Sequence, residues 1–142
     1  MCATYYARTS DHGYETCAEH LAMAGCLAGG FAKGFGYLDD GLLAGLVHDL
    51  GKYSDAFQRR IRNPDHCGPV DHSTAGALLL MRHVCPLAAM AVAGHHAGLP
   101  DLGSYGELEG STFMSRMNRA RRAGDCNPLA LAQAGEAQLD IP

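Results

Sequence analysis

The chain has 142 residues and a net charge of −4 at pH 7, with 47% hydrophobic and 18% charged residues. This length and composition predict one globular domain with its own core and exclude an intrinsically disordered chain. No apolar run reaches the roughly 18 residues of a membrane-spanning helix, and the N-terminus lacks a signal-peptide pattern. The six cysteines include no C-x-x-C pair. We therefore expect a cytoplasmic protein with free thiols and no membrane partner.

The first half of the chain predicts three helices after an extended lead-in at 5–10 and a turn at 11–13. From about Glu15 to Phe35, apolar residues recur every three or four positions, which indicates a helix with one face toward the core. That face comprises Leu21, Ala24, Ala28, Phe31 and Phe35. Asp39 or Asp40 would cap a second helix ending at Gly51. Ser54 would cap a third, which contacts the core through Phe57 and Ile61.

The second half predicts further helices after a loop at Asn63–Pro69. Asp71 or Ser73 would cap a helix from Ala75 to about Val84. Pro86 suits the first turn of the next helix, which would run to His95-His96. Beyond residue 100 the pattern weakens into a loop at 101–110, a helix at Phe113–Arg122 and a weaker helix at Pro128–Leu139. No alternating strand pattern of useful length occurs, so the sequence predicts an all-α domain over residues 1–142.

An apolar helical run at 42–47 leads directly into His48-Asp49, followed by Gly51-Lys52. Imidazole binds borderline transition metals, and a carboxylate can bridge two ions. Gly51 would end the helix in a left-handed turn and let Lys52 face a bound phosphate. The same composition also suits an ordinary helix C-terminus, so this stretch alone leaves both interpretations open.

Five histidines and one aspartate fall at helix ends or core-facing helix positions: His20, His48, Asp49, His72, His95 and His96. Helices of an antiparallel bundle can bring such positions into one pocket. Adjacent residues point in different directions, which favours two metal ions over a single tetrahedral site. Imidazoles around one carboxylate suit Mn, Ni, Co, Fe or Zn better than Mg or Ca.

Basic residues cluster at 59–62 and at 116–122. Each cluster is either a solvated helix face or a phosphate-binding track, and the overall negative charge favours the first.

The order of the six candidate ligands resembles the HD superfamily of metal-dependent phosphohydrolases. Residues 48–52 (HDLGK), 71–77 (DHSTAGA) and 94–101 (GHHAGLPD) are more narrowly similar to the HD nuclease domain of type I CRISPR systems. The opening segments 5–7 (YYA) and 19–21 (EHL) fit the same family. The resemblance covers residues 5–101, whereas 102–142 match weakly.

This resemblance implies a helical bundle that binds one or two divalent transition-metal ions and cuts single-stranded DNA. The implied partners are single-stranded DNA, a CRISPR helicase subunit or domain, and the RNA-guided surveillance complex. The chain lacks the G-x-x-x-x-G-K-[ST] phosphate loop of such a motor.

The resemblance also implies roles for individual residues. One ion would be held by His20, His48 and Asp49. The other would be held by His72, His95 and His96, with Asp49 as a bridge. Asp49 and Lys52 would be the catalytic residues, and Lys52 and Ser73 would bind substrate.

The sequence departs from the family pattern in two places. Ala7-Arg8 stands where the family usually has Ala-His. The family domain also continues further and supplies a late aspartate ligand, whereas Asp125 and Asp140 lie in no matching segment. We therefore expect a bundle shortened at its C-terminus, with an incomplete first metal site and some exposed apolar surface.

Two alternatives to a nuclease remain open. A shortened chain could act as a decoy or regulator that binds the CRISPR machinery without cutting, including as an inhibitor. It could also be an HD nucleotide phosphohydrolase.

Overall fold

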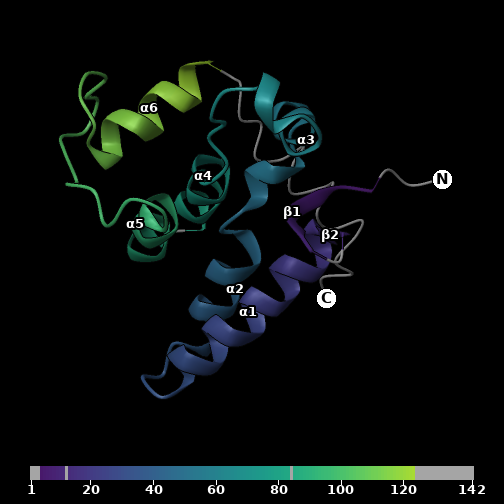
Figure 1. The fold of residues 1–142 in the computed structure, drawn as a ribbon. Helices are drawn as coiled ribbons and strands as arrows, with labels where there is room; N and C mark the ends of the chain where they lie inside the picture. Colours follow the sequence, from purple (N-terminus) through teal and green to yellow (C-terminus); the bar gives the residue numbers. More distant parts are fainter. Residues whose placement is uncertain (1–3, 12, 84, 124–142) are drawn as a thin grey trace.

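The computed structural model describes residues 4–11, 13–83 and 85–123, and these are mostly helical, which confirms the predicted fold class. In chain order the elements are β1 (Tyr6–Ser10), β2 (Gly13–Thr16), α1 (Cys17–Lys33), α2 (Leu38–Val47), the 3₁₀ helix η1 (Leu50–Tyr53), α3 (Asp55–Arg62), the 3₁₀ helix η2 (Pro64–His66), α4 (Thr74–Arg82), α5 (Pro86–Gly94) and α6 (Phe113–Ala123). Figure 1 labels the strands and the α-helices. The turn residue His12, the predicted helix Pro128–Leu139, Asp125 and Asp140 lie outside the described residues.

A two-stranded antiparallel hairpin precedes α1, so the expectation that the chain contains no strand is wrong here. Each strand is too short to give a reliable alternating pattern. The other edge of β1 is satisfied by a distant side chain: the Gln58 amide accepts from the Tyr6 N–H (3.1 Å) and donates to the Tyr6 carbonyl (2.8 Å). Tertiary contact therefore stabilises a hairpin that local sequence does not reveal.

Helix α1 begins at Cys17, two residues later than predicted, because Thr16 and Glu19 form a capping box. The Thr16 hydroxyl accepts from the Glu19 N–H, and the Glu19 carboxylate accepts from the Thr16 N–H, each at 3.2 Å. Helices α1 and α2 then lie side by side (Figure 1). Their backbones approach closely, since a Cβ on Gly45 would lie 2.5 Å from the Ala24 carbonyl oxygen.

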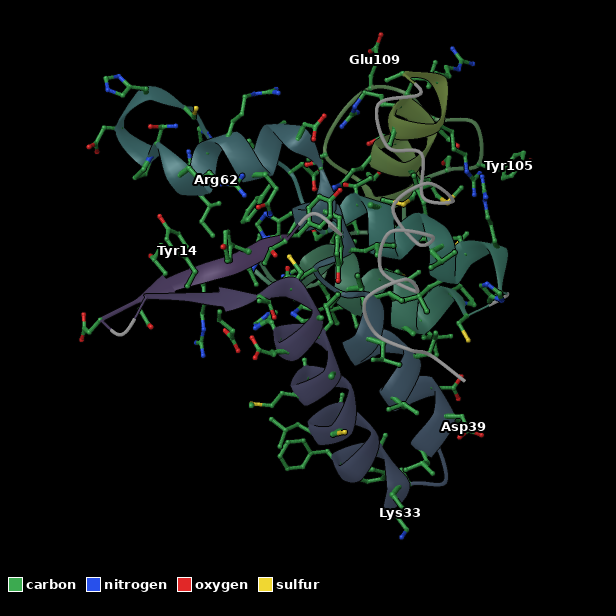
Figure 2. The ribbon with its side chains drawn as sticks, turned by 90° about the vertical axis from the view of Figure 1, so that its right-hand side faces the viewer. Tyr14, Lys33, Asp39, Arg62, Tyr105 and Glu109 are labelled. Atoms are coloured by element: carbon green, nitrogen blue, oxygen red, sulfur yellow. The ribbon has the colours of Figure 1, made fainter. Side chains whose placement is uncertain are left out.

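The apolar face predicted for α1 is only partly buried. Leu21 is fully buried, whereas Phe31 and Phe35 are 77% and 80% exposed. In Figure 2, Lys33 and Asp39 mark the end of the α1–α2 pair that lies away from α6. Helical periodicity finds an apolar face, but it does not determine how much of that face another element covers.

Helix α2 ends at Val47, earlier than the predicted end at Gly51, and the chain turns through His48 and Asp49 into η1. Its N-cap is Tyr37 rather than an aspartate, and Asp39 and Asp40 lie in the first turn. The predicted left-handed turn at Gly51 is also wrong, since Gly51 lies within η1 and outside the positive-φ glycines.

Other predicted elements agree with the structure. The Ser54 hydroxyl accepts from the Phe57 N–H (3.3 Å) and caps α3, and Phe57 is buried. Helix α5 begins with Pro86 in its first turn, and it ends at Gly94, just before the predicted His95-His96. Helix α6 extends one residue past its predicted end.

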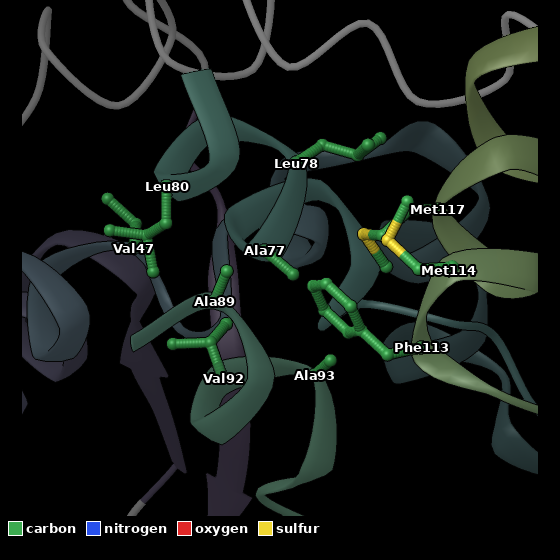
Figure 3. Close-up of a cluster of buried hydrophobic side chains, with 10 residues drawn as sticks. All are labelled: Val47, Ala77, Leu78, Leu80, Ala89, Val92, Ala93, Phe113, Met114 and Met117. Carbon is green, nitrogen blue, oxygen red and sulfur yellow. The ribbon is translucent and has the colours of Figure 1, made fainter. Parts of the chain in front are cut away.

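Two buried apolar clusters flank the turn between α2 and η1. The larger one joins α2, α4, α5 and α6 and is shown in Figure 3: Val47, Ala77, Leu78, Leu80, Ala89, Val92, Ala93, Phe113, Met114 and Met117. The smaller one joins β1, α1, η1 and α4: Ala7, Cys17, Leu21, Leu50, Tyr53 and Ala75. Because Val47 and Leu50 belong to different clusters, His48 and Asp49 occupy the short turn between them.

Among the described helices, none combines the length and apolar character needed to cross a membrane. The cysteines in the described part of the chain carry free thiols: Cys17, Cys26, Cys67 and Cys85.

Candidate metal centre

The fold brings all six predicted ligands together. Their ligand atoms form two groups that share Asp49: His20 and His48 with Asp49, and His72, His95 and His96 with Asp49. Within each group these atoms lie within 4.8 Å of one another. Of the other histidines, His66 and His83 lie outside both groups and are exposed.

The Asp49 carboxylate is the buried centre of this cluster, with 3% of the residue exposed. Its Oδ2 lies 3.0 Å from His20 Nε2 and 3.2 Å from His48 Nε2. Its Oδ1 lies 3.2 Å from His95 Nε2 and 3.5 Å from His72 Nε2. Burial by itself raises the pKa of Asp49, but the facing imidazoles outweigh it and hold the pKa well below the ordinary carboxyl range. Asp49 is therefore ionised at neutral pH.

Backbone carbonyls orient three of the imidazoles. The Nδ1 atoms of His48, His72 and His95 lie 2.8, 3.0 and 2.7 Å from the carbonyl oxygens of residues 45, 70 and 92. A carbonyl oxygen only accepts, so each Nδ1 donates a proton. In a neutral ring Nε2 would then carry the lone pair, which is the tautomer that metal-binding histidines use, whereas in a protonated ring Nε2–H donates to the Asp49 carboxylate.

This arrangement fits a divalent cation. Without one, lone pairs on Nε2 face the negative carboxylate unless the rings are protonated. The buried Oδ1 of Asp49 has no hydrogen-bond partner in the described part of the chain. A buried acceptor without a donor is costly, and a cation coordinated by Oδ1 and the imidazoles would remove that cost. The nitrogen-rich ligand set suits Mn, Fe, Co, Ni or Zn.

The second group places two rings in direct contact. His72 Nε2 and His96 Nε2 lie 2.7 Å apart, within hydrogen-bond distance of each other. Burial lowers the pKa of His72, and burial followed by the charge of His95 lowers the pKa of His96. The carboxylate of Asp49 raises the pKa of His95. The lowered values favour the neutral rings that metal binding requires.

His20 is held by a carboxylate instead of a carbonyl. Its Nδ1 lies 3.4 Å from Glu15 Oε2 at the end of β2, and Glu15 in turn pairs with Arg8 across the hairpin. A carboxylate on the far nitrogen of a metal-binding histidine fixes the orientation of the ring. The hairpin therefore contributes to the metal centre through His20.

Lys52 is paired with Asp49 and does not extend into solvent. Its Nζ is 2.6 Å from Asp49 Oδ2, and it lies 5.6 Å from the centre of the Phe57 ring. The residue is buried, with 9% exposed. Its ammonium group balances the carboxylate charge in this state, so its contact with a substrate phosphate stays a prediction.

Gly51 connects the two ligand groups through the backbone. Its N–H donates to the His72 carbonyl at 3.0 Å. A Cβ at this position would lie 2.5 Å from both the Cα and the carbonyl oxygen of His72. Only glycine permits this close approach, which sets the distance between Asp49 and His72.

Arg116 from α6 joins the segments that carry the second ligand group. Its guanidinium donates to Thr74 Oγ1 (2.6 Å), the Ala93 carbonyl (2.7 Å), Ser73 Oγ (2.7 Å) and Asp71 Oδ1 (2.9 Å). These acceptors flank the start of α4 and the end of α5. The guanidinium fork therefore fixes the two ligand-bearing turns relative to each other. The same contact leaves Ser73, the predicted substrate contact, buried against Arg116.

Each of the two residues predicted to cap α4 supplies part of the cap. Ser73 is the N-cap residue but makes no side-chain capping bond. Asp71 Oδ1 instead accepts from the N–H groups of Ser73 and Thr74, each at 3.1 Å. Asp71 therefore satisfies the helix start and Arg116 together.

Sequence reasoning missed Glu15 and misread Arg116. Glu15 lies five residues before His20, a spacing with no special meaning until the hairpin folds. Arg116 belongs to the basic cluster at 116–122, yet its guanidinium is bound by acceptors of the chain itself, from Asp71 to Ala93. Its neighbour Arg119 also binds backbone, donating to the carbonyls of Leu108 and Gly110 at 2.8 Å.

No protein-family model matches the chain, and no curated protein sequence matches it either. The functional assignment therefore depends on the residues of this chain, their geometry and the motifs they form.

Proposed function

We propose that the chain is a metal-dependent phosphodiesterase domain with one or two divalent transition-metal ions at Asp49. The specific form indicated by its motifs is a nuclease for single-stranded DNA in type I CRISPR interference. The observation that carries the proposal is a buried carboxylate faced by several imidazole Nε2 atoms, three of them oriented by backbone carbonyls.

The residues would divide the work as follows. His20, His48 and Asp49 would hold one ion, and Asp49, His72, His95 and His96 the other. When bound, the ions would lower the pKa of a water molecule and neutralise phosphate charge. Lys52 balances the charge of Asp49. Once an ion takes over that role, the Lys52 side chain would turn toward a substrate phosphate. The buried turn excludes bulk water from Asp49 and strengthens each of these electrostatic contacts.

The partners remain part of the proposal. The overall charge of −4 predicts weak binding of nucleic acid by the chain alone, because few phosphates can be neutralised. A helicase subunit or domain would then deliver the single strand to the metal centre, within an RNA-guided complex.

The test is cleavage of circular single-stranded DNA by the purified chain with Mn, Ni, Co, Fe, Zn and Mg in turn. The Asp49→Asn variant should lose cleavage and bound metal, since it removes the shared ligand charge. The matched controls Asp39→Asn and His66→Ala change exposed residues outside the cluster and should keep both. Cleavage that persists in Asp49→Asn would contradict the proposal.

Two other outcomes identify the alternatives. A folded chain that binds metal but cuts no DNA under any condition favours the decoy or regulator. Release of phosphate from nucleotides, without cleavage of the circle, favours the nucleotide phosphohydrolase.

A further inference from the structure

The face of α1 that points away from α2 is apolar and exposed. Met23, Leu27 and Phe31 follow one another at about one helical turn, and more than half of each residue is exposed. Between Glu19 and Lys33 the helix carries no Asp, Glu, Lys or Arg. Soluble proteins rarely leave a contiguous apolar face uncovered, so this face of α1 indicates an interaction surface.

Small residues lie along the same face. Ala22, Cys26 and Gly30 recur at every fourth position, and all three are exposed. A Cβ added to Gly30 would meet nothing within 4 Å in the described part of the chain, whereas a Cβ on Gly25, on the side toward α2, would lie 2.8 Å from Leu46. Because the side chains at a helix contact set the distance between the two axes, this face lets the backbone of a second helix approach closely.

The charges at its two ends make the face complementary to itself. Glu19 and Lys33 are both exposed, and each lies seven residues from Cys26, on opposite sides of it. Neither forms an ion pair with another described residue. If two copies of α1 pack antiparallel around a two-fold axis at Cys26, Glu19 of each copy lies opposite Lys33 of the other. A parallel pair would place like charges opposite each other at both ends.

We propose that this face of α1 is the interface of a homodimer, in which the α1 helices of two copies pack antiparallel around a two-fold axis at Cys26. Burial of Met23 and Leu27 supplies the favourable free energy, and the Glu19–Lys33 pairs set the direction of the helices. One helix face makes a small interface, so the dimer forms reversibly and its fraction rises with protein concentration. The inference does not depend on the proposed function.

The first test is sedimentation of the full chain over a series of concentrations. The measured mass should rise from that of one chain toward that of two as the concentration increases. The mass of a single chain at every concentration overturns the inference and leaves this face to another partner.

Reversing one charge tests the direction of the helices. Lys33→Glu sets two carboxylates opposite each other at both ends of the interface, and it should raise the Kd of the dimer about tenfold. Arg82→Glu is the matched control, since Arg82 is likewise an exposed basic residue in the last turn of its helix, but on α4. It should leave the Kd unchanged. Equal weakening by the two substitutions would overturn the inference.

Cross-linking tests the position of the two-fold axis. In a variant that keeps only Cys17 and Cys26, the one exposed thiol is Cys26, because Cys17 is buried. A short bis-maleimide should join two such chains through Cys26. The matched control keeps Cys67 in place of Cys26 and should give no joined product. A dimer that forms without the Cys26 cross-link uses a different surface, which overturns the inference.

Discussion

The two ligand groups around Asp49 are supported in different ways. His20 and His48 lie on α1 and at the end of α2, two helices whose backbones touch through Ala24 and Gly45. His72, His95 and His96 lie on turns at the start of α4 and the end of α5, and the Arg116 side chain from α6 joins those turns. The first group depends on backbone packing close in sequence, and the second depends on one long-range side chain.

This difference predicts that substitutions can weaken metal binding by one group without affecting the other. A substitution in the backbone contact between the two groups should lower the metal affinity of both. A substitution among the residues that support one group should lower the metal affinity of that group alone. Asp49 is the exception, because both groups use it.

The largest effect is expected for Gly51→Ala, which changes the backbone contact between Gly51 and His72 that joins the two groups. The added methyl group would lie 2.5 Å from His72 backbone atoms, and overpacking of this kind costs about 1–3 kcal/mol. We expect the free energy of unfolding in urea to fall by about 2 kcal/mol and both ions to bind more weakly. Gly68→Ala is the matched control, since its Cβ meets nothing within 4 Å, and it should change stability by less than about 0.5 kcal/mol. Equal effects of the two substitutions would refute the role given to Gly51.

The next largest effect is expected for Arg116→Lys, which keeps the charge but removes the planar fork. Loss of such an outer contact lowers metal affinity by about 10–100-fold, and here the loss should fall on the ion held by His72, His95 and His96. Calorimetric titration with Mn²⁺ should then resolve one weakened and one unchanged site. Arg119→Lys, on the same helix but bound to the carbonyls of Leu108 and Gly110, should leave both unchanged. Parallel weakening of both sites would contradict separate support.

The smallest effect is expected for Glu15→Gln, which keeps an acceptor for His20 Nδ1 and removes its charge. Without the charge that holds the His20 ring in place, the first group should bind its ion several-fold more weakly, up to about tenfold, while the second group is unaffected. The measurement is the same titration. Glu109→Gln is the control, since Glu109 is exposed on the loop before α6 (Figure 2). No change in Glu15→Gln would mean that the hairpin does not support the metal centre.

The gathering of the six candidate ligands and the positions of most helices were predictable from the sequence. Histidines at helix ends and on one helix face, with an apolar run leading into His48-Asp49, indicate a common pocket because helix geometry directs those positions inward. The cap at Ser54 and the first-turn position of Pro86 were also predictable, since each acts on its own first turn. The cap predicted for α2 was not, because Tyr37 takes that place. The hairpin was not, because β1 depends on Gln58, which lies 52 residues beyond Tyr6.

The sequence by itself determined the kinds of ligand and their order along the chain, because residue type and helical period are local properties. Tertiary structure alone decided which ring nitrogen faces Asp49, how close His72 approaches it and which side chain holds the second group. These depend on backbone carbonyls, which every residue has, and on contacts such as Arg116 with Thr74, 42 residues apart.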